Sequence, residues 1–491
     1  MPHCIPLLRL LLILGIVAAA PAAADPVYMI VTSESLASEF EPLALWRTAH
    51  GLPAEVRTVE WITAHYSGAD DAESVRLFLQ DAYASLGTSF LLLGGDSEVV
   101  PVRYARTTFY TPTDILTDYY FMCLDGTWNG DGDEHFGEVE DAVDLLPEIC
   151  AGRAPVSTAL EARTFVERTI AYESALPEPG YPASALFLAE RLTPGFHGAV
   201  IAEEALGFLP SSFSVLRLYE EGSFPWPGPG ALPLTREAAI TAINAGYGLV
   251  HHIGRGTEGH WGLGDSLLTI PDVQALTNAP RFPVVCTFSG WTAAFDFGDA
   301  IGEHWLTNPG GGAAAYIGAT SLSWIAAGRD IQREWFRLVF DESVTRIGLA
   351  AALARLPFVE QAREESSMRC MFFTIELLGD PALAMHGETP AAMDPPTAAS
   401  PFLLGGPAPN PFADHTSITV HLLRDAADAE VSIYDANGRL IHRLFSSPLP
   451  RGRHALRWSG AGLSGKVPPG TYFVRFEAGG TAVSRKVVRL Q

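Results

Sequence analysis

Two stretches of the chain gather the residue types that nucleophilic catalysis requires. They cover residues 248–261 and 282–296, and their candidate groups are His251, His252, His260, Cys286 and Ser289. A thiol or hydroxyl beside an imidazole can attack a carbonyl carbon, because the imidazole takes the proton and later returns it to the leaving group. Each stretch is a short apolar run followed by a glycine-containing loop, which is typical of a buried parallel strand and its carboxyl end. Ligands of α/β proteins bind at such ends, so we expect a site where the two loops meet.

The two loops also resemble a known family, the gingipain family of secreted cysteine peptidases, whose fold is caspase-like. In that family the first strand ends in Gly-His-Gly, followed by a small hydroxyl residue, Glu and Trp. The matching residues here are Gly254, Gly256, Thr257, Glu258 and Trp261. The position of the general-base histidine holds Arg255. In the family the nucleophilic cysteine stands five residues before a Phe, and counting back from Phe295 gives Gly290.

Neither substitution keeps the family's chemistry. The pKa of arginine exceeds about 12, so its guanidinium stays charged and takes no proton from a thiol. Glycine has no side chain with which to attack. The resemblance therefore implies a peptidase relative in which both dyad positions, Arg255 and Gly290, have lost their function.

Two substitute pairs are conceivable. Cys286 and either His251 or His252 lie on strands that are neighbours in the family. Cys286 and His251, however, each stand four residues before the dyad position, roughly 13 Å back along the strand. Ser289 with His260 is the second pair, but strand alternation turns Ser289 away from the face of position 290. We expect core packing for these residues.

Arg255 is open to two interpretations. Its planar guanidinium can clamp a carboxylate through two hydrogen bonds at the mouth of a cleft. Alternatively, it pairs with Glu258 or Asp296 and fills the space of the missing dyad. We expect Glu258, Trp261 and Asp296 to line this cleft, with Trp261 as a wall or core aromatic.

The rest of the pattern predicts the elements that position these loops. Apolar runs alternate with helical periodicity from residue 27 to residue 320, which indicates doubly wound parallel sheets. Further landmarks of the family extend the resemblance over residues 27–386: Leu93-Gly-Gly-Asp96, Gly152-Arg153, Gly302-Glu303 and Leu377-Leu-Gly-Asp380-Pro381. We predict two caspase-like α/β subdomains, residues 25–178 and 179–386.

An acidic, glycine-rich loop within residues 118–156 is a candidate cation site. Its oxygen-bearing side chains are Asp125, Asn129, Asp131, Asp133, Glu138 and Glu140. Alternating carboxylates on a flexible loop suit Ca²⁺. The sixth position counted from Asn129 is Glu134, where an EF-hand requires glycine, so this is no EF-hand. Gingipains are known for bound calcium, and the resemblance implies a structural ion; a solvated acidic loop is the alternative.

Composition places the chain among exported globular proteins. It has 491 residues, 48% of them hydrophobic, and a formal net charge of −24, which argues against a nucleic-acid partner. Arg9, an apolar run and three alanines before Asp25 predict a signal peptide over residues 1–24. We expect a secreted or cell-surface protein with no transmembrane segment. An even count of cysteines after the signal permits disulfides, although Cys286 is expected to be a free buried thiol.

The end of the chain has a different composition. A Thr/Pro/Ala-rich linker, residues 387–403, precedes period-two strands that predict a small Ig-like β-sandwich over residues 404–491. This part resembles flagellar-hook-capping Ig-like modules and the C-terminal sorting modules of type IX secreted proteins. The resemblance implies a partner in the export machinery or a display role; a structural spacer is the alternative.

Three functions follow from these observations. The favoured one is a gingipain-family homologue without hydrolytic activity that binds a peptide or protein, or serves as a surface protein. The second is an active cysteine-type endopeptidase that uses non-standard residues. The third is a structural protein of the cell envelope whose working part is the C-terminal sandwich.

Overall fold

The computed structural model describes residues 27–174, 180–221, 230–296 and 298–385 of the α/β part. In the C-terminal part it describes residues 402–404, 411–422, 425–435, 439–450, 452–462, 465–479 and 481–490. The predicted signal peptide and most of the predicted linker lie outside the described residues.

The first half of the α/β part alternates strands and helices as the sequence predicts. Its elements are β1 (Tyr28–Thr32), α1 (Ala37–Ala49), β2 (Ala54–Thr58), α2 (Val59–His65), α3 (Asp71–Leu86), β3 (Phe90–Gly94), β4 (Arg103–Thr107), β5 (Thr113–Thr117), α4 (Tyr119–Met122), β6 (Cys150–Ala154) and α5 (Ala159–Ser174). Helix α3 shows why the boundaries fall where they do. The Asp70 side chain accepts a hydrogen bond from Glu73 N at its start, and Gly87 ends it with a φ of 75°.

The second half carries the two stretches that resemble catalytic loops. Its first elements are β7 (Ser184–Ala189), β8 (Arg191–Thr193), β9 (Phe196–His197), α6 (Ala199–Leu206), β10 (Ser214–Tyr219), β11 (Leu232–Pro233), α7 (Arg236–Ala245), β12 (Leu249–Ile253), β13 (Gly256–Thr257), β14 (His260–Leu263), β15 (Ser266–Thr269) and α8 (Ile270–Gln274). It continues with β16 (Val284–Thr287), α9 (Ile301–Thr307), β17 (Ala315–Ala319), α10 (Ile325–Phe336), a π-helical turn (Arg337–Asp341), α11 (Ile347–Arg355), a 3₁₀ turn (Leu356–Phe358), α12 (Val359–Ala362), α13 (Ser367–Thr374) and β18 (Ile375–Gly379).

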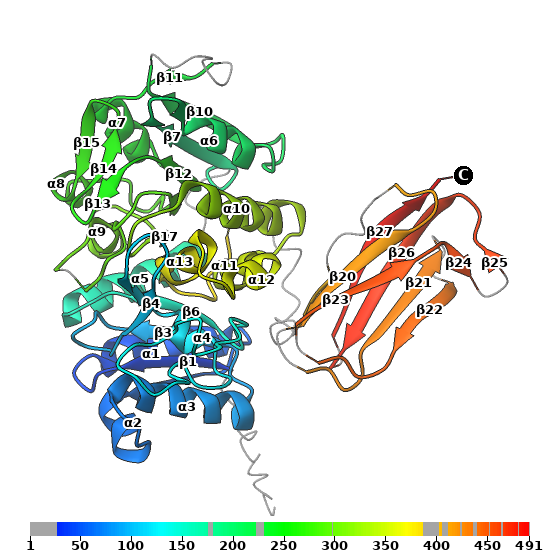
Figure 1. The fold of residues 1–491 in the computed structure, drawn as a ribbon. Coiled ribbons are helices and arrows are strands. Elements are labelled where there is room, and N and C mark those ends of the chain that lie inside the picture. Colours follow the sequence, from blue (N-terminus) through cyan, green and yellow to red (C-terminus); the bar gives the residue numbers. More distant parts are fainter. Residues whose placement is uncertain are drawn as a thin grey trace, which may run out of the picture.

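Both halves share one sheet (Figure 1). Its eleven strands run in the order β11-β10-β7-β12-β16-β17-β18-β6-β3-β1-β2. The pairs are parallel except for β17 with β18, and β18 joins the halves by pairing Leu378 with Arg153 of β6. The α/β fold class with a large, mainly parallel sheet is therefore confirmed, and the two predicted subdomains meet edge to edge.

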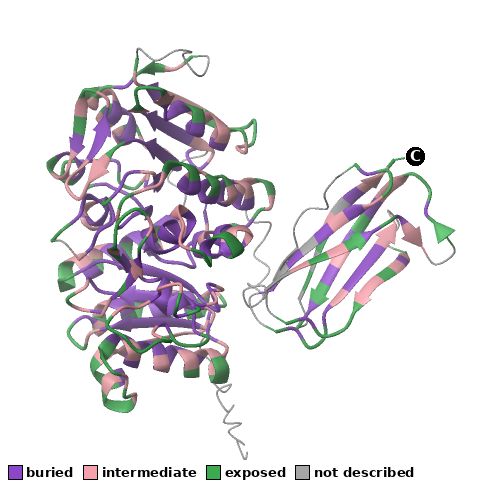
Figure 2. Cartoon of the chain, in the orientation of Figure 1, coloured by how far each residue is buried: buried purple, intermediate pink, exposed green. Residues whose placement is uncertain are grey.

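Helices cover both faces of this sheet. Successive residues of β12 show this, because their side chains point to opposite faces. His251 lies against Gln332 and Phe336 of α10. His252 stacks on Trp261, which stacks on Trp305 of α9. Figure 2 shows the consequence: the central strands of the sheet are buried along their length, whereas exposed residues are on the outer helix surfaces, the loops and the edge strand β11.

The C-terminal module is a separate all-β unit, as predicted. Its strands are β19 (Phe402–Leu404), β20 (Thr416–Leu422), β21 (Glu430–Asp435), β22 (Leu440–Ser446), β23 (Gly452–Trp458), β24 (Ala461–Gly462), β25 (Gly465–Lys466), β26 (Gly470–Ala478) and β27 (Thr481–Arg489). Two sheets, β19-β20-β23 and β22-β21-β26-β27, enclose a core that contains Ile418, Trp458 and Phe476. The module contacts the α/β part through Arg485, whose guanidinium lies 3.0 Å from the Glu342 carboxylate.

Two further expectations concern cysteines and membrane spans. The cysteines Cys123, Cys150, Cys286 and Cys370 are all buried and free, so the possibility of disulfides among them is not realised. The expectation of a free, buried Cys286 agrees with this finding. Within the described residues, no helix has the length and apolarity that crossing a membrane requires.

Candidate functional site

An open pocket lies at the carboxyl ends of β12 and β16, where the sequence predicts a site. Its volume is about 180 Å³. We call it the Arg255 pocket, and it is lined by Leu192, Ile201, Ile253, Gly254, Arg255, Gly256, Phe288, Gly290, Trp291, Leu322, Ser323 and Ile325. Both predicted dyad positions, Arg255 and Gly290, are therefore in its wall.

The register of the two strands brings these positions together. Strands β12 and β16 pair in parallel from Leu249 with Val284 onward, and Phe288 N donates to His252 O at 3.0 Å. The loops then approach so closely that a Cβ on Gly256 would lie 2.6 Å from the Ser289 Cβ. Glycine is required at 256 because any side chain there would collide with the second loop.

Arg255 pairs with a residue that the sequence analysis did not single out. Its Nε donates to Glu190 Oε1 at 2.9 Å, and its backbone N donates to the same oxygen at 2.5 Å. The prediction that Arg255 pairs with Glu258 or Asp296 is therefore wrong. The Arg255 side chain is 67% exposed, whereas the Glu190 side chain is fully buried. The hydrogen bond that Arg255 donates to Glu190 raises the pKa of Arg255 further above its ordinary value, so this guanidinium cannot serve as a base.

Glu190 is itself fixed by the surrounding backbone. It directly follows β7, which is the neighbour of β12 on the other side from β16. Its Oε2 accepts from Gly264 N at 2.9 Å, and a Cβ on Gly262 would lie 2.7 Å from Oε1. A carboxylate directly after an apolar strand was the signal that could have identified Glu190 in the sequence, Leu186-Phe-Leu-Ala-Glu190.

Gly290 leaves room where a nucleophile would be needed. The nearest atom to a Cβ built at this residue is Ser321 O, at 3.2 Å. A small side chain therefore fits after a shift of a few tenths of an ångström. The next residue, Trp291, has a φ of 60°, so the chain turns sharply at this point.

Cys286 and His251 are paired neighbours, but they lie inside the sheet. His251 Nδ1 donates to Cys286 O at 3.1 Å, and both residues are buried. Burial lowers the pKa of His251 to about 3 and raises that of Cys286 to about 12. The thiol thus stays protonated and has no accessible carbonyl to attack.

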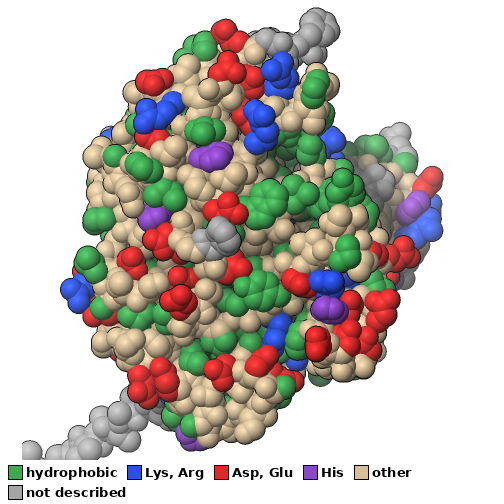
Figure 3. Space-filling model, turned by 60° about the vertical axis from the view of Figure 1, so that its left-hand side comes forward, with side chains coloured by type: hydrophobic (Ala, Val, Ile, Leu, Met, Phe, Trp, Pro, Cys, Tyr) green, Lys and Arg blue, Asp and Glu red, His purple; other side chains and the backbone are tan. Residues whose placement is uncertain are grey.

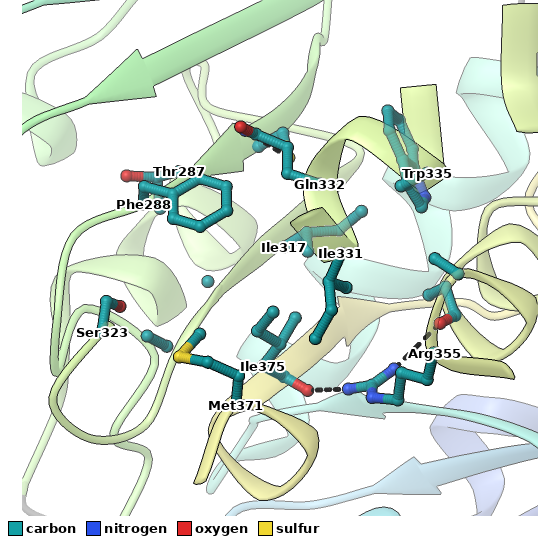
Figure 4. A pocket seen from close by; sticks show the side chains of 15 residues that line it. Thr287, Phe288, Ile317, Ser323, Ile331, Gln332, Trp335, Arg355, Met371 and Ile375 are labelled. Atoms are coloured by element: carbon teal, nitrogen blue, oxygen red, sulfur yellow. Dashed lines mark hydrogen bonds between the residues drawn. The ribbon is translucent and has the colours of Figure 1, made fainter. Parts of the chain in front are cut away.

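Cys286 lines a second cavity, of only about 30 Å³, beneath the Arg255 pocket. Figure 4 shows this cavity among side chains from β16, β17, α10 and the segment around Met371 and Ile375. Phe288 and Ser323 line both cavities and separate them. About 10–15 Å³ is needed for one water molecule, so this space admits no peptide.

Ser289 contacts a histidine other than the one considered from the sequence. Its Oγ lies 3.0 Å from His252 Nδ1 and 3.0 Å from Gly254 O. The pairing of Ser289 with His260, which strand alternation disfavours, is not found, since His260 Nδ1 lies 3.0 Å from Thr257 Oγ1 instead. Ser289 and His252 are fully buried, and burial lowers the pKa of His252 to about 4. This pair joins the two loops from within and is closed to substrate.

The three residues expected to line the cleft are elsewhere. Trp261 is fully buried, and its Nε1 donates to Tyr316 OH at 2.9 Å, which agrees with its interpretation as a core aromatic. Glu258 is on the β13–β14 hairpin, where its carbonyl accepts from Ile301 N at 2.7 Å. Asp296 accepts from Tyr104 OH at 2.8 Å. None of the three lines the Arg255 pocket.

The six predicted cation ligands separate into smaller groups. Oxygen atoms of Asp131, Asp133 and Glu138 lie within 4.8 Å of one another. Asn129 Oδ1 is shielded from solvent and accepts no hydrogen bond from the described residues. Asn129 Nδ2 donates to Asp133 O at 2.8 Å. Asp125 belongs to another acidic group, with Asp144 and Glu148. Glu140 belongs to neither group. Hard oxygen ligands of this kind fit Ca²⁺.

Fold and site together define the class of protein: an α/β peptidase fold followed by an Ig-like module. The profile of "Peptidase family C25" matches residues 22–386, which is most of the chain. The profile of the "FlgD Ig-like domain" matches residues 409–481. The chain therefore belongs to peptidase family C25, the gingipain family, and the predicted family and the Ig-like module are confirmed.

Solved structures agree on the fold. The crystal structure of the Arg-specific cysteine proteinase gingipain R (RGPB) has a TM-score of 0.59 at 19% identity, over 95% of this chain and 100% of that one. The complex of the Porphyromonas gingivalis RgpB pro- and mature domains has a TM-score of 0.58 at 18% identity, over 94% and 100%. An uncharacterised protein of Archaeoglobus fulgidus is 24% identical over 339 residues, covering 60% of this chain and 75% of that protein.

Proposed function

We propose that this protein is a family C25 member that binds peptide segments in the Arg255 pocket without hydrolysing them. The observation that carries the proposal is the pair of residues at the two strand ends. An arginine held by Glu190 and a glycine stand in the wall of one pocket, where acyl transfer requires a base and a nucleophile. Glycine at 290 supplies no attacking atom, and Arg255 accepts no proton.

The other candidate nucleophiles do not replace them. The Cys286 thiol is buried beside a cavity of only about 30 Å³, and the Ser289 hydroxyl is fully buried under the loops. Both nearby imidazoles, His251 and His252, are buried and have lowered pKa values. The alternative of an active endopeptidase with non-standard residues therefore lacks a reachable pair among the described residues.

Exposed apolar side chains around the pocket favour a binding role. At its edge Trp291, Leu322 and Ile325 are 36%, 43% and 37% exposed. Beside them Trp324 packs against Phe109, with ring centroids 4.9 Å apart, and against Tyr110, at 5.8 Å. Tyr110 is 82% exposed. Figure 3 shows apolar side chains gathered in patches on one face of the molecule. Contiguous exposed apolar surface is a feature of interaction sites.

Export and display are part of the proposal. The signal-like N-terminus, with Arg9 before an apolar run, supports secretion. The Ig-like module then acts in sorting or surface display through a partner in the export machinery. Deleting residues 401–491 and following both export and surface attachment tests this role: loss of attachment with a folded α/β part supports it, and unchanged attachment removes it.

Calcium is proposed as a structural ligand of the acidic loop. It would be held by the carboxylates of Asp131, Asp133 and Glu138 and by Asn129 Oδ1, which accepts no hydrogen bond from any described residue. Desolvation and then the charge of Asp133 raise the pKa of Glu138, because repulsion from a neighbouring anion disfavours its ionised form. A cation relieves this repulsion and orders the loop.

The experiment that tests the main proposal combines binding with product analysis. Purified protein is mixed with a peptide library, bound peptides are recovered, and all peptides are examined by mass spectrometry. Recovery of intact peptides, with no new termini, is the expected result. New termini whose formation a thiol alkylator blocks would contradict it.

A further inference from the structure

The Arg255 pocket combines an apolar interior with one cationic group at its edge. Ile201 and Ile253 are buried in its wall, and Leu192 and Phe288 are half-buried. Among the described residues, no aspartate or glutamate lines it. The side chain of lysine or arginine would therefore enter this space without a charge partner, which is costly.

The size of the pocket matches a single apolar side chain. Its volume is about 180 Å³. A cavity of about 150 Å³ lined by Leu, Ile and Phe holds a benzene molecule. Phenylalanine, leucine and methionine side chains therefore fit, and a longer apolar segment does not.

The Arg255 guanidinium at the edge of the pocket has N–H groups that can donate hydrogen bonds to a ligand. Arg255 uses its Nε for Glu190, and among the described residues no partner is found for its terminal Nη1 and Nη2. Glu220, the other acidic residue whose charge reaches Arg255, accepts from Arg191 N at 2.7 Å. The Nη1 and Nη2 edge of a guanidinium matches the two oxygens of a carboxylate.

We propose that the Arg255 pocket binds the free carboxyl terminus of a peptide or protein whose last residue is apolar. The terminal side chain occupies the space between Ile253 and Phe288, and the terminal carboxylate accepts two hydrogen bonds from Arg255. An internal segment lacks this carboxylate, so a chain end is bound in preference. This inference rests on the proposed function and specifies its ligand.

A binding measurement with matched peptides tests the inference. The chain contains two lysines, Lys466 and Lys486, and both are in the C-terminal module. Coupling the full-length protein to a sensor surface through amines therefore favours attachment by that module and leaves the pocket open. Octapeptides acetylated at the N-terminus and ending in Phe, Leu or Met are compared as free acids and as amides, with versions ending in Lys or Glu as further controls.

We expect each free acid with an apolar end to bind at least about tenfold more tightly than its amide, because charge-assisted hydrogen bonds are lost on amidation. Arg255→Gln keeps a donor for Glu190 and removes the positive charge, so the acid and the amide should bind equally to it. Gly290→Leu fills the pocket and should weaken every apolar-ended peptide. Thermal melting shows that each variant is folded.

The outcomes separate the inference from the function on which it rests. If the wild-type protein binds amides as tightly as acids, or if Arg255→Gln keeps the preference, the carboxylate assignment is overturned and peptide binding stands. If the wild-type protein binds none of these peptides but captures internal segments with blocked ends, the carboxylate assignment is likewise overturned and peptide binding stands. If it binds no peptide at all, both proposals fail.

Discussion

Arg255 Nε lies 2.9 Å from Oε1 of Glu190, a fully buried carboxylate. The pair joins the loop after β12 to the end of β7, and it sets the position of the guanidinium at the pocket. A guanidinium that cannot act as a base is thereby held at the position that the family resemblance assigns to the histidine.

Glu190→Ala should lower the free energy of unfolding by about 2–4 kcal/mol, since it leaves the N–H groups of Arg255 and Gly264 without their acceptor. Most of this loss belongs to the backbone groups, because the Arg255 side chain is exposed and screened by solvent. Urea denaturation measures it. Glu237→Ala is the matched control: that side chain is 80% exposed, so a change within about 0.5 kcal/mol is expected. Equal effects in the two variants would contradict the role of Glu190.

The thiols give a second prediction. Burial raises the pKa of Cys150 and Cys286 to about 12 and also raises those of Cys123 and Cys370. At pH 8 the thiolate fraction of a group with a pKa of 12 is about 10⁻⁴, so native alkylation should be at least about a thousandfold slower than that of an exposed cysteine. In denaturant without reductant, these four thiols should all react with the alkylating reagent. The Cys286→Ala variant should show one reactive thiol fewer. Rapid native labelling of Cys286 would mean that its cavity opens.

The position of the two loops could be predicted from the sequence, and their contacts could not. The apolar runs that become β12 and β16, the glycine-containing loops after them and the residues at 255 and 290 follow from local pattern and family spacing. Glu190 was missed because its partner is 65 residues away and is fixed only by the order of β7 and β12 in the sheet. The contact of Ser289 with His252 could not be predicted, since the register that brings the two residues together is a tertiary property. The sequence predicted the place of the pocket but not its apolar lining, because residues outside the two loops, such as Leu192, Ile201 and Leu322, complete its walls.

Acid stability should depend on the buried histidines. His251 has a pKa of about 3 in the folded state and an ordinary value near 6.5 when unfolded. Between about pH 6.5 and pH 3 the unfolded chain binds a proton that the folded chain does not, so the free energy of unfolding falls as the pH falls. His251→Gln should flatten this dependence by up to about 1.4 kcal/mol per pH unit.

The comparison with the wild type is essential in this experiment. Burial and then the charge of Asp118 raise the pKa of Glu376 to about 8, so acidification from that pH stabilises the folded state and opposes the histidine effect. Only the difference between the two proteins isolates His251. Parallel stability curves from pH 7 to pH 4 would contradict a buried neutral imidazole at this position.

Calcium should stabilise the α/β part. With Ca²⁺ at about a hundred times its dissociation constant, the melting temperature should rise by about 3–6 °C, and a chelator should reverse the rise. Asp131→Asn and Asp133→Asn should each reduce the shift, whereas Glu140→Gln, which lies outside the carboxylate group, should preserve it. The same shift in all three variants would place the ion elsewhere.

The central claim is that the fold is intact and the catalytic pair is absent. The most direct test is a hydrolysis assay with casein and fluorogenic peptides carrying Phe or Leu before the scissile bond. It compares the wild-type protein with the double variant Arg255→His/Gly290→Cys, whose imidazole can donate to Glu190 and whose thiol fits the space at 290. The wild type should not exceed the buffer rate, and the double variant should exceed it at least about a hundredfold, in a manner blocked by iodoacetamide. Hydrolysis by the wild-type protein that iodoacetamide or Cys286→Ala abolishes would contradict the account.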